Sequence, residues 1–231
     1  MACKKHSGII EKDMAVSTES TMIDLARIKL GNYAKDKRLV VVRSYNSSAN
    51  LECQTTRILK QLGMAHMIAV CTSDPDFPNY LPRYHMHPEQ YVIVPKGAHK
   101  VSFTLATACK GTQVSHLIIV DDNWELLSCK SGGSRRNLTR NQFLSVLDSA
   151  WTAMCEHSMS VWSIASHNNI NFLKGSSPNT VANFICKNSL CYGPLTGFHI
   201  TQQANVHAIY SSAREDVERT VQMKMLYLPI N

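Results

Sequence analysis

The stretch His116-Leu-Ile-Ile-Val-Asp-Asp-Asn123 decides the fold of this chain. Its four consecutive apolar residues, three of them β-branched, are typical of a buried central strand. Two carboxylates follow, and because like charges repel and are costly to bury, such a pair usually faces a cation or a ligand. Ligands of open α/β sheets bind beyond the carboxyl ends of the strands. The stretch therefore predicts a binding site at Asp121 and Asp122, with a strand ending in a plain acidic turn as the alternative.

Upstream of this strand, apolar runs alternate with helical patterns. The sequence predicts strands at 38–42, 67–71 and 91–94, and helices near 21–30, 51–62 and 99–110. Strands separated by helices indicate a doubly wound, mostly parallel sheet. We therefore expect an N-terminal extension over residues 1–36, followed by one α/β domain over residues 37–231.

Beyond Asn123 the pattern becomes less regular. The sequence predicts a loop at 131–136, a helix at 141–157, strands at 161–164 and 184–186, a turn into a strand at 193–200, and a final helix at 213–226. His85 and His87 are two histidines that could bind a metal. The flanking Pro82 and Pro88 predict a loop around His85-Met-His87, so a loop is favoured over a metal site there. Cys186 and Cys191 lack a nearby His or acid at the usual spacing, so buried thiols are favoured over zinc.

The composition indicates a soluble globular protein that suits anionic ligands. Lys and Arg total 24 against 17 Asp and Glu, a net charge of +7, but the basic residues are scattered and form no nucleic-acid-binding arm. Eight cysteines without a C-x-x-C pair predict a reduced, intracellular protein. The N-terminus lacks the apolar core of a signal peptide, and no apolar run approaches the ~20 residues of a membrane span, so we expect no membrane association.

Two common nucleotide-binding motifs are missing from the sequence. Neither the P-loop pattern G-x-x-x-x-G-K-[ST] nor the dinucleotide pattern G-x-G-x-x-G occurs. A third class of nucleotide-binding sheet remains, in which an acidic strand end holds a divalent cation across a diphosphate. A hard cation with oxygen ligands would neutralise the charge that develops on a diphosphate leaving group.

Motifs after the predicted strands carry a resemblance over residues 38–226. They are Val42-Arg-Ser-Tyr-Asn46, Tyr91-Val-Ile-Val-Pro-Lys-Gly97, Ile118-Ile-Val-Asp-Asp-Asn123, Val161-Trp-Ser163 with Asn168-Asn169 and Phe172-Leu-Lys174, and Arg214-Glu-Asp-Val-Glu-Arg-Thr220. In this order they resemble the TET-associated glycosyltransferases, known from phages that decorate modified DNA bases. They also resemble the related C-terminal domain of the vertebrate "growth regulation by estrogen in breast cancer" proteins, and the residue usage favours that estrogen-regulated branch.

The resemblance implies a GT-A-like, Rossmann-like α/β fold over residues 37–231, with a mostly parallel mixed sheet and flanking helices. It implies a glycosyltransferase that moves a sugar, such as N-acetylglucosamine, from a UDP donor to a Ser or Thr hydroxyl of a protein acceptor. A divalent cation, Mn²⁺ or Mg²⁺, would be the cofactor. The estrogen-regulated branch adds a nuclear or cytoplasmic location and a transcription factor as acceptor.

The same resemblance implies roles for individual residues. Donor-binding residues would be Arg43, Ser44, Tyr45, Lys96, Gly97 and Asp121. Asp122 and Asn123 would face the metal, and Glu215 and Asp216 would contact the donor sugar or activate the acceptor hydroxyl. From the residues alone, Arg43 could cap a sheet edge, Tyr45 could be a core aromatic, and Glu215-Asp216 could be an acidic helix start.

Two departures from the family pattern keep other functions open. Asn123 stands where many members carry a third Asp, and the chain ends fifteen residues after Asp216, where members usually continue. A catalytically weak or inert interaction module of a transcriptional coregulator is therefore the main alternative. Glycosylation of modified DNA bases is a second alternative, which the net charge permits without specifically supporting.

Overall fold

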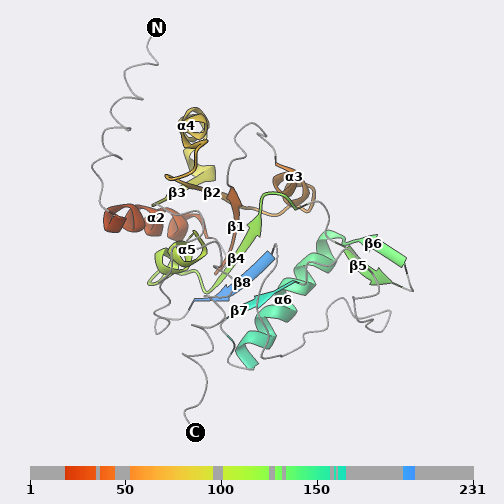
Figure 1. Ribbon diagram of the computed structural model, residues 1–231. Helices are drawn as coiled ribbons and strands as arrows, with labels where there is room; N and C mark the ends of the chain where they lie inside the picture. The colour runs from red at the N-terminus through yellow and green to blue at the C-terminus, as the bar shows by residue number, and fades with distance from the viewer. Residues whose placement is uncertain are drawn as a thin grey trace.

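The strands form one six-stranded sheet in the order β3-β2-β1-β4-β8-β7, with helices on both faces and a separate two-stranded hairpin (Figure 1). The computed structural model describes residues 19–34, 37–44, 53–95, 101–124, 128–131, 134–156, 159, 161–164 and 195–200. The strands β1 (Arg38–Ser44), β2 (Met67–Cys71), β3 (Tyr91–Val94) and β4 (His116–Asp121) run parallel. The strand β8 (Leu195–His199) is antiparallel to β4, and β7 (Val161–Ser163) is antiparallel to β8. The predicted mostly parallel α/β sheet is thus confirmed.

Helices cover both faces of this sheet because the central strands are apolar on both sides. Leu39 and Val41 of β1 pack toward α2 (Glu19–Tyr33) and α5 (Val101–Cys109). Val40 and Val42 of the same strand pack toward α3 (Gln54–Gln61) and α6 (Arg140–Glu156). Such two-sided burial explains the nearly continuous apolar runs of β1 and β4.

Two smaller helical elements complete the sheet's edge. The helix α4 (Phe77–Met86) buries Tyr80 against Val70 and Tyr91, and the short 3₁₀ helix η1 (Pro88–Gln90) leads into β3. The helix α2, which belongs to the expected N-terminal extension, buries Ala26 and Leu30 in the core beside α5 (Figure 1). No helix within the described ranges is long and apolar enough to cross a membrane.

Two expectations about loops are wrong. The predicted loop at 131–136 is largely the hairpin of β5 (Ser128–Ser131) and β6 (Ser134–Asn137), in which only 132–133 remain for the connection. A pair of glycines is typical of an open loop and of a tight hairpin connection alike, so the local sequence does not distinguish the two. The predicted loop around 82–88 is mostly α4, which contains Pro82. Burial of one helix face outweighs the single backbone donor that Pro82 removes. The expected strand at 184–186 and final helix at 213–226 lie outside the described residues.

A polar aromatic cluster occupies the amino end of β4, on the side that α6 covers. Trp162 donates its Nε1–H to His116 Nε2 at 3.0 Å, and the His116 ring stacks on Trp151 with centroids 5.1 Å apart. The Trp162 indole can lie directly over β8 because its partner there is Gly197. A Cβ at residue 197 would stand 2.1 Å from the indole Nε1. The glycine therefore makes room for the buried hydrogen bond.

This cluster holds His116 in its neutral form. Because indole N–H groups only donate, His116 must accept at Nε2 and carry its own proton at Nδ1. Burial, followed by the positive charge of Arg38 and by His199, lowers the pKa of His116 to about 3, while Asp148 acts in the opposite direction. Arg38 itself pairs with Asp148 of α6. The amino end of the sheet is thus closed by α6.

We expect Gly197→Ala to destabilise the fold by about 2–4 kcal/mol, because the new methyl group displaces the indole and leaves His116 unsatisfied. Urea unfolding of the purified protein measures this cost. In a Trp162→Leu background, where the indole is gone, the same substitution should cost less than about 1 kcal/mol. Equal costs in both backgrounds would contradict the packing described above.

His116 should also make stability depend on pH. At pH 7 the His116 ring is mostly neutral in the folded and in the unfolded protein. Below the ordinary His pKa of about 6.5, the unfolded chain binds a proton on this ring and the folded protein does not. Stability should therefore fall with pH, by about 2 kcal/mol between pH 7 and about pH 5 from this group alone. Urea unfolding curves of the native protein and of His116→Gln at both pH values separate the contribution of His116 from that of other groups. The variant should be less stable than the native protein at pH 7, and its free energy of unfolding should fall less between the two pH values.

Candidate functional site

The candidate site lies where the strand order of the sheet reverses. From β1 the chain adds β2 and then β3 on one side, and returns through α5 to place β4 on the other side of β1. Ligands of open α/β sheets bind outside the carboxyl ends of the strands at such a switch point. Here β1 ends with Arg43 and Ser44, and β4 ends with Asp121.

An ion pair joins the two strand ends. Arg43 and Asp121 are register partners in the β1–β4 pairing. Arg43 donates from Nε at 3.1 Å and from Nη2 at 2.7 Å, both to Oδ1 of Asp121. The side chains remain 26% and 30% exposed, so solvent or a ligand can reach them. The pair is therefore a contact at the rim of the sheet.

A hydroxyl relay orients the second acid. Ser44 donates to Asp122 Oδ2 at 3.3 Å, and its Oγ lies 2.8 Å from the phenol oxygen of Tyr80 on α4. Since Ser44 has one proton, donating it to Asp122 leaves the oxygen to accept from Tyr80. Ser44 and Tyr80 are both buried. The relay thus anchors Asp122 to β1 and to α4.

A buried threonine secures the turn that carries the acids. Thr55, in the first turn of α3, donates from Oγ1 to the carbonyl of Asp121 at 2.5 Å and accepts from the backbone N–H of Trp124 at 2.8 Å. Its residue is fully buried. One side chain therefore satisfies backbone groups on both sides of Asp122 and Asn123, which holds this turn against α3.

The structure brings together five of the residues predicted from the sequence. Arg43 and Ser44 end β1, Asp121 ends β4, and Asp122 with Asn123 forms the turn that follows. The other predicted residues, Tyr45, Lys96, Gly97, Glu215 and Asp216, lie outside the described residues. The resemblance assigns Arg43 and Asp121 to ligands, whereas here they contact each other.

Sequence reasoning missed two residues of this site. Tyr80 lies in a segment between prolines that carries no strand or motif signal, and its role depends on how α4 packs against β2 and β3. Thr55 is one of two threonines at the start of a predicted helix, where a hydroxyl usually signals a local cap. Its actual partners are at Asp121 and Trp124, which no local pattern indicates.

The donor atoms at this turn suit a hard divalent cation. Asp121, Asp122 and Asn123 offer carboxylate and amide oxygens, the ligands that Mg²⁺ and Mn²⁺ prefer. No cluster of three or more His, Cys, Asp or Glu residues suited to a metal occurs in the described part of the chain. Mg²⁺ commonly uses one or two carboxylates together with substrate phosphates and water, so the donor set fits a cation that arrives with a phosphate ligand.

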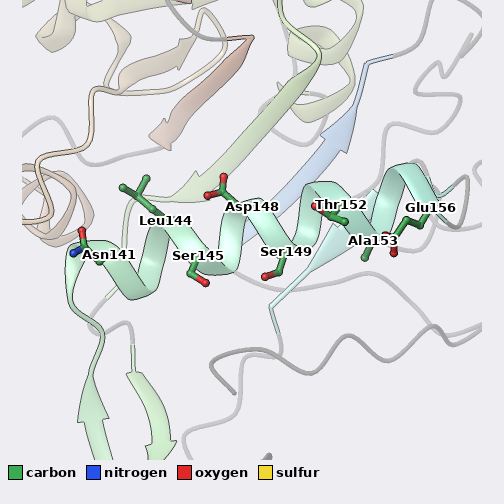
Figure 2. Close-up of a pocket in the computed structure, with 8 residues that line it drawn as sticks. All are labelled: Asn141, Leu144, Ser145, Asp148, Ser149, Thr152, Ala153 and Glu156. Carbon is green, nitrogen blue, oxygen red and sulfur yellow. The ribbon is translucent and has the colours of Figure 1, made fainter. Parts of the chain in front are cut away.

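A separate hollow of about 640 Å³ runs along the outer face of α6 (Figure 2). The described residues of its lining all belong to this one helix: Asn141, Leu144, Ser145, Asp148, Ser149, Thr152, Ala153 and Glu156. It contains none of the residues predicted from the sequence to bind a ligand. We therefore place the candidate site at the sheet's carboxyl edge.

Comparisons with protein-family models, with curated proteins and with solved structures find no match for this chain. Function is therefore inferred from the geometry of the strand ends and from the motifs of the sequence.

We expect Thr55→Val to destabilise the protein by about 1–3 kcal/mol, because the Asp121 carbonyl and the Trp124 N–H lose a buried partner while the side-chain shape is kept. Thr55→Ser is the matched control, since it retains the hydroxyl. Urea unfolding should show Ser closer than Val to the native protein. If Val were the more stable of the two, the hydroxyl would not be what holds this turn.

Proposed function

We propose that this protein is a nucleotide-sugar-dependent glycosyltransferase of GT-A-like fold, with its donor site at the carboxyl ends of β1 and β4. One observation carries the proposal: the basic, hydroxyl and acidic residues predicted to bind the donor meet at the switch point of the sheet. The donor would be a UDP-sugar, such as UDP-N-acetylglucosamine, and the acceptor a protein hydroxyl.

The chemistry requires stabilisation of a departing diphosphate. A bound Mn²⁺ or Mg²⁺ would supply Lewis-acid neutralisation of that charge. Arg43 would contribute a guanidinium, whose planar array of donors matches phosphate oxygens. Both groups would be in position before the reaction begins, because preorganised charge lowers the barrier by stabilising the charge that develops in the transition state.

The remaining residues would position the donor. The Ser44–Tyr80 relay holds Asp122 in one orientation through Oδ2. The direction of its other oxygen, Oδ1, is therefore set before a ligand binds. Asp121 would bind the cation together with Asp122 and would also accept from ribose or sugar hydroxyls. Glu215 and Asp216 would orient or deprotonate the acceptor hydroxyl.

A second candidate is a catalytically weak or inert module that acts through protein contacts in a transcriptional coregulator. The Arg43–Asp121 ion pair favours it, because two residues expected to bind ligand already satisfy each other. Asn123, which lacks a charge, weakens the metal site further. Four cysteines, Cys53, Cys71, Cys109 and Cys155, are free thiols, which supports a location in the reducing nucleus or cytoplasm for either function.

We expect UDP-N-acetylglucosamine to bind the native chain in the presence of Mn²⁺ and to bind Asp122→Asn at least about tenfold more weakly. Isothermal titration calorimetry with and without Mn²⁺ measures both affinities. Asp148→Asn is the control, because it removes the same charge from α6 at the amino end of β1, away from the carboxyl ends of the strands. Absence of binding with and without Mn²⁺ would overturn the enzyme proposal and favour the interaction module.

A further inference from the structure

We propose that the Arg43–Asp121 ion pair is a latch that makes binding of a divalent cation and binding of a diphosphate depend on each other. The inference rests on the proposed function and adds how that site is regulated. It implies that the resting site has paired its own charges, and that only the two ligands together replace this pair.

The geometry suits an exchange of partners. Two nitrogens of Arg43 converge on one oxygen of Asp121, at 3.1 and 2.7 Å. Both residues end strands that are neighbours in the sheet, so their backbones are held while their side chains can turn. Because each side chain is about a quarter to a third exposed, a ligand can displace the contact without unfolding a buried element.

The charges explain why one ligand alone is disfavoured. A diphosphate that binds Arg43 in place of Asp121 leaves the Asp121 carboxylate beside negative phosphate oxygens. Like charges close together repel each other. A cation that takes Asp121 leaves the Arg43 guanidinium next to a second positive charge. When both ligands bind, each protein charge gains a partner of opposite sign, and the cation and diphosphate neutralise each other.

Asp122 provides a comparison within the same site. It accepts from the neutral hydroxyl of Ser44, so removing its charge breaks no Arg43–Asp121 contact. Neutralising either acid reduces repulsion of an anion, but only neutralising Asp121 also weakens the contact that holds the guanidinium. The latch therefore predicts different effects for two adjacent acids.

The first test is calorimetric titration of UDP, without metal and with a chelator, into the native protein and three variants. We expect Asp121→Asn to bind UDP at least about fivefold more tightly than the native protein. Asp122→Asn should change the affinity less than about twofold. Asp148→Asn, from the Arg38–Asp148 pair at the other end of β1, should leave it unchanged.

The second test titrates Mn²⁺ alone. We expect Arg43→Gln to bind Mn²⁺ at least about fivefold more tightly than the native protein, because Asp121 loses a competing cationic partner and a nearby positive charge is removed. Thermal melting checks that each variant is folded. This arm stands without Asp121→Asn, should that variant fail to fold.

The outcomes separate the latch from the donor site. If the native protein binds UDP with Mn²⁺ but Asp121→Asn binds metal-free UDP equally or more weakly, the latch is overturned and the proposed function stands. If the native protein fails to bind UDP with Mn²⁺, the proposed function is overturned. Pyrophosphate then replaces UDP in the same series: tighter binding by Asp121→Asn keeps the latch for another diphosphate, and unchanged binding overturns it.

Discussion

The pairing of β1 with β4 is the constraint on which the rest of the structure depends. Six consecutive residue pairs join these strands, from Arg38 opposite His116 to Arg43 opposite Asp121. A slip of one residue would exchange the two faces of a strand, so each apolar side chain would face the opposite layer of helices. One register therefore fixes the two-sided core and decides which polar side chains meet at each end of the sheet.

The two ends of this pairing use polar groups differently. At the amino end, Trp162 donates to a neutral His116, and Arg38 pairs with an acid on α6, so helix and sheet are tied together. At the carboxyl end, the acids accept from Arg43 and Ser44 and stay partly exposed. Charge is thus kept reachable at the end where α/β sheets bind ligands.

Much of the fold could be predicted from apolar runs. The strands at 67–71 and 91–94 and the helix along α6 match closely, because each buries a continuous or helically spaced apolar set. The hairpin of β5 and β6 and the helix α4 could not, because Gly-Gly and Pro82 indicate loops locally while pairing and packing decide otherwise. At the site, the position of Asp122 after a buried strand could be predicted from the sequence. The roles of Tyr80 and Thr55 could not, because they depend on contacts between distant segments.

The Arg43–Asp121 contact shows why a motif does not by itself specify a site. Both residues carry charges that suit a ligand, yet in the folded chain each first meets the other, since they share a register position. A fully buried pair would resist exchange, because breaking it leaves an unpaired charge out of water. A partly exposed pair costs less to open and contributes little to stability by itself. Its exposure, more than its presence, makes this pair compatible with binding a charged ligand.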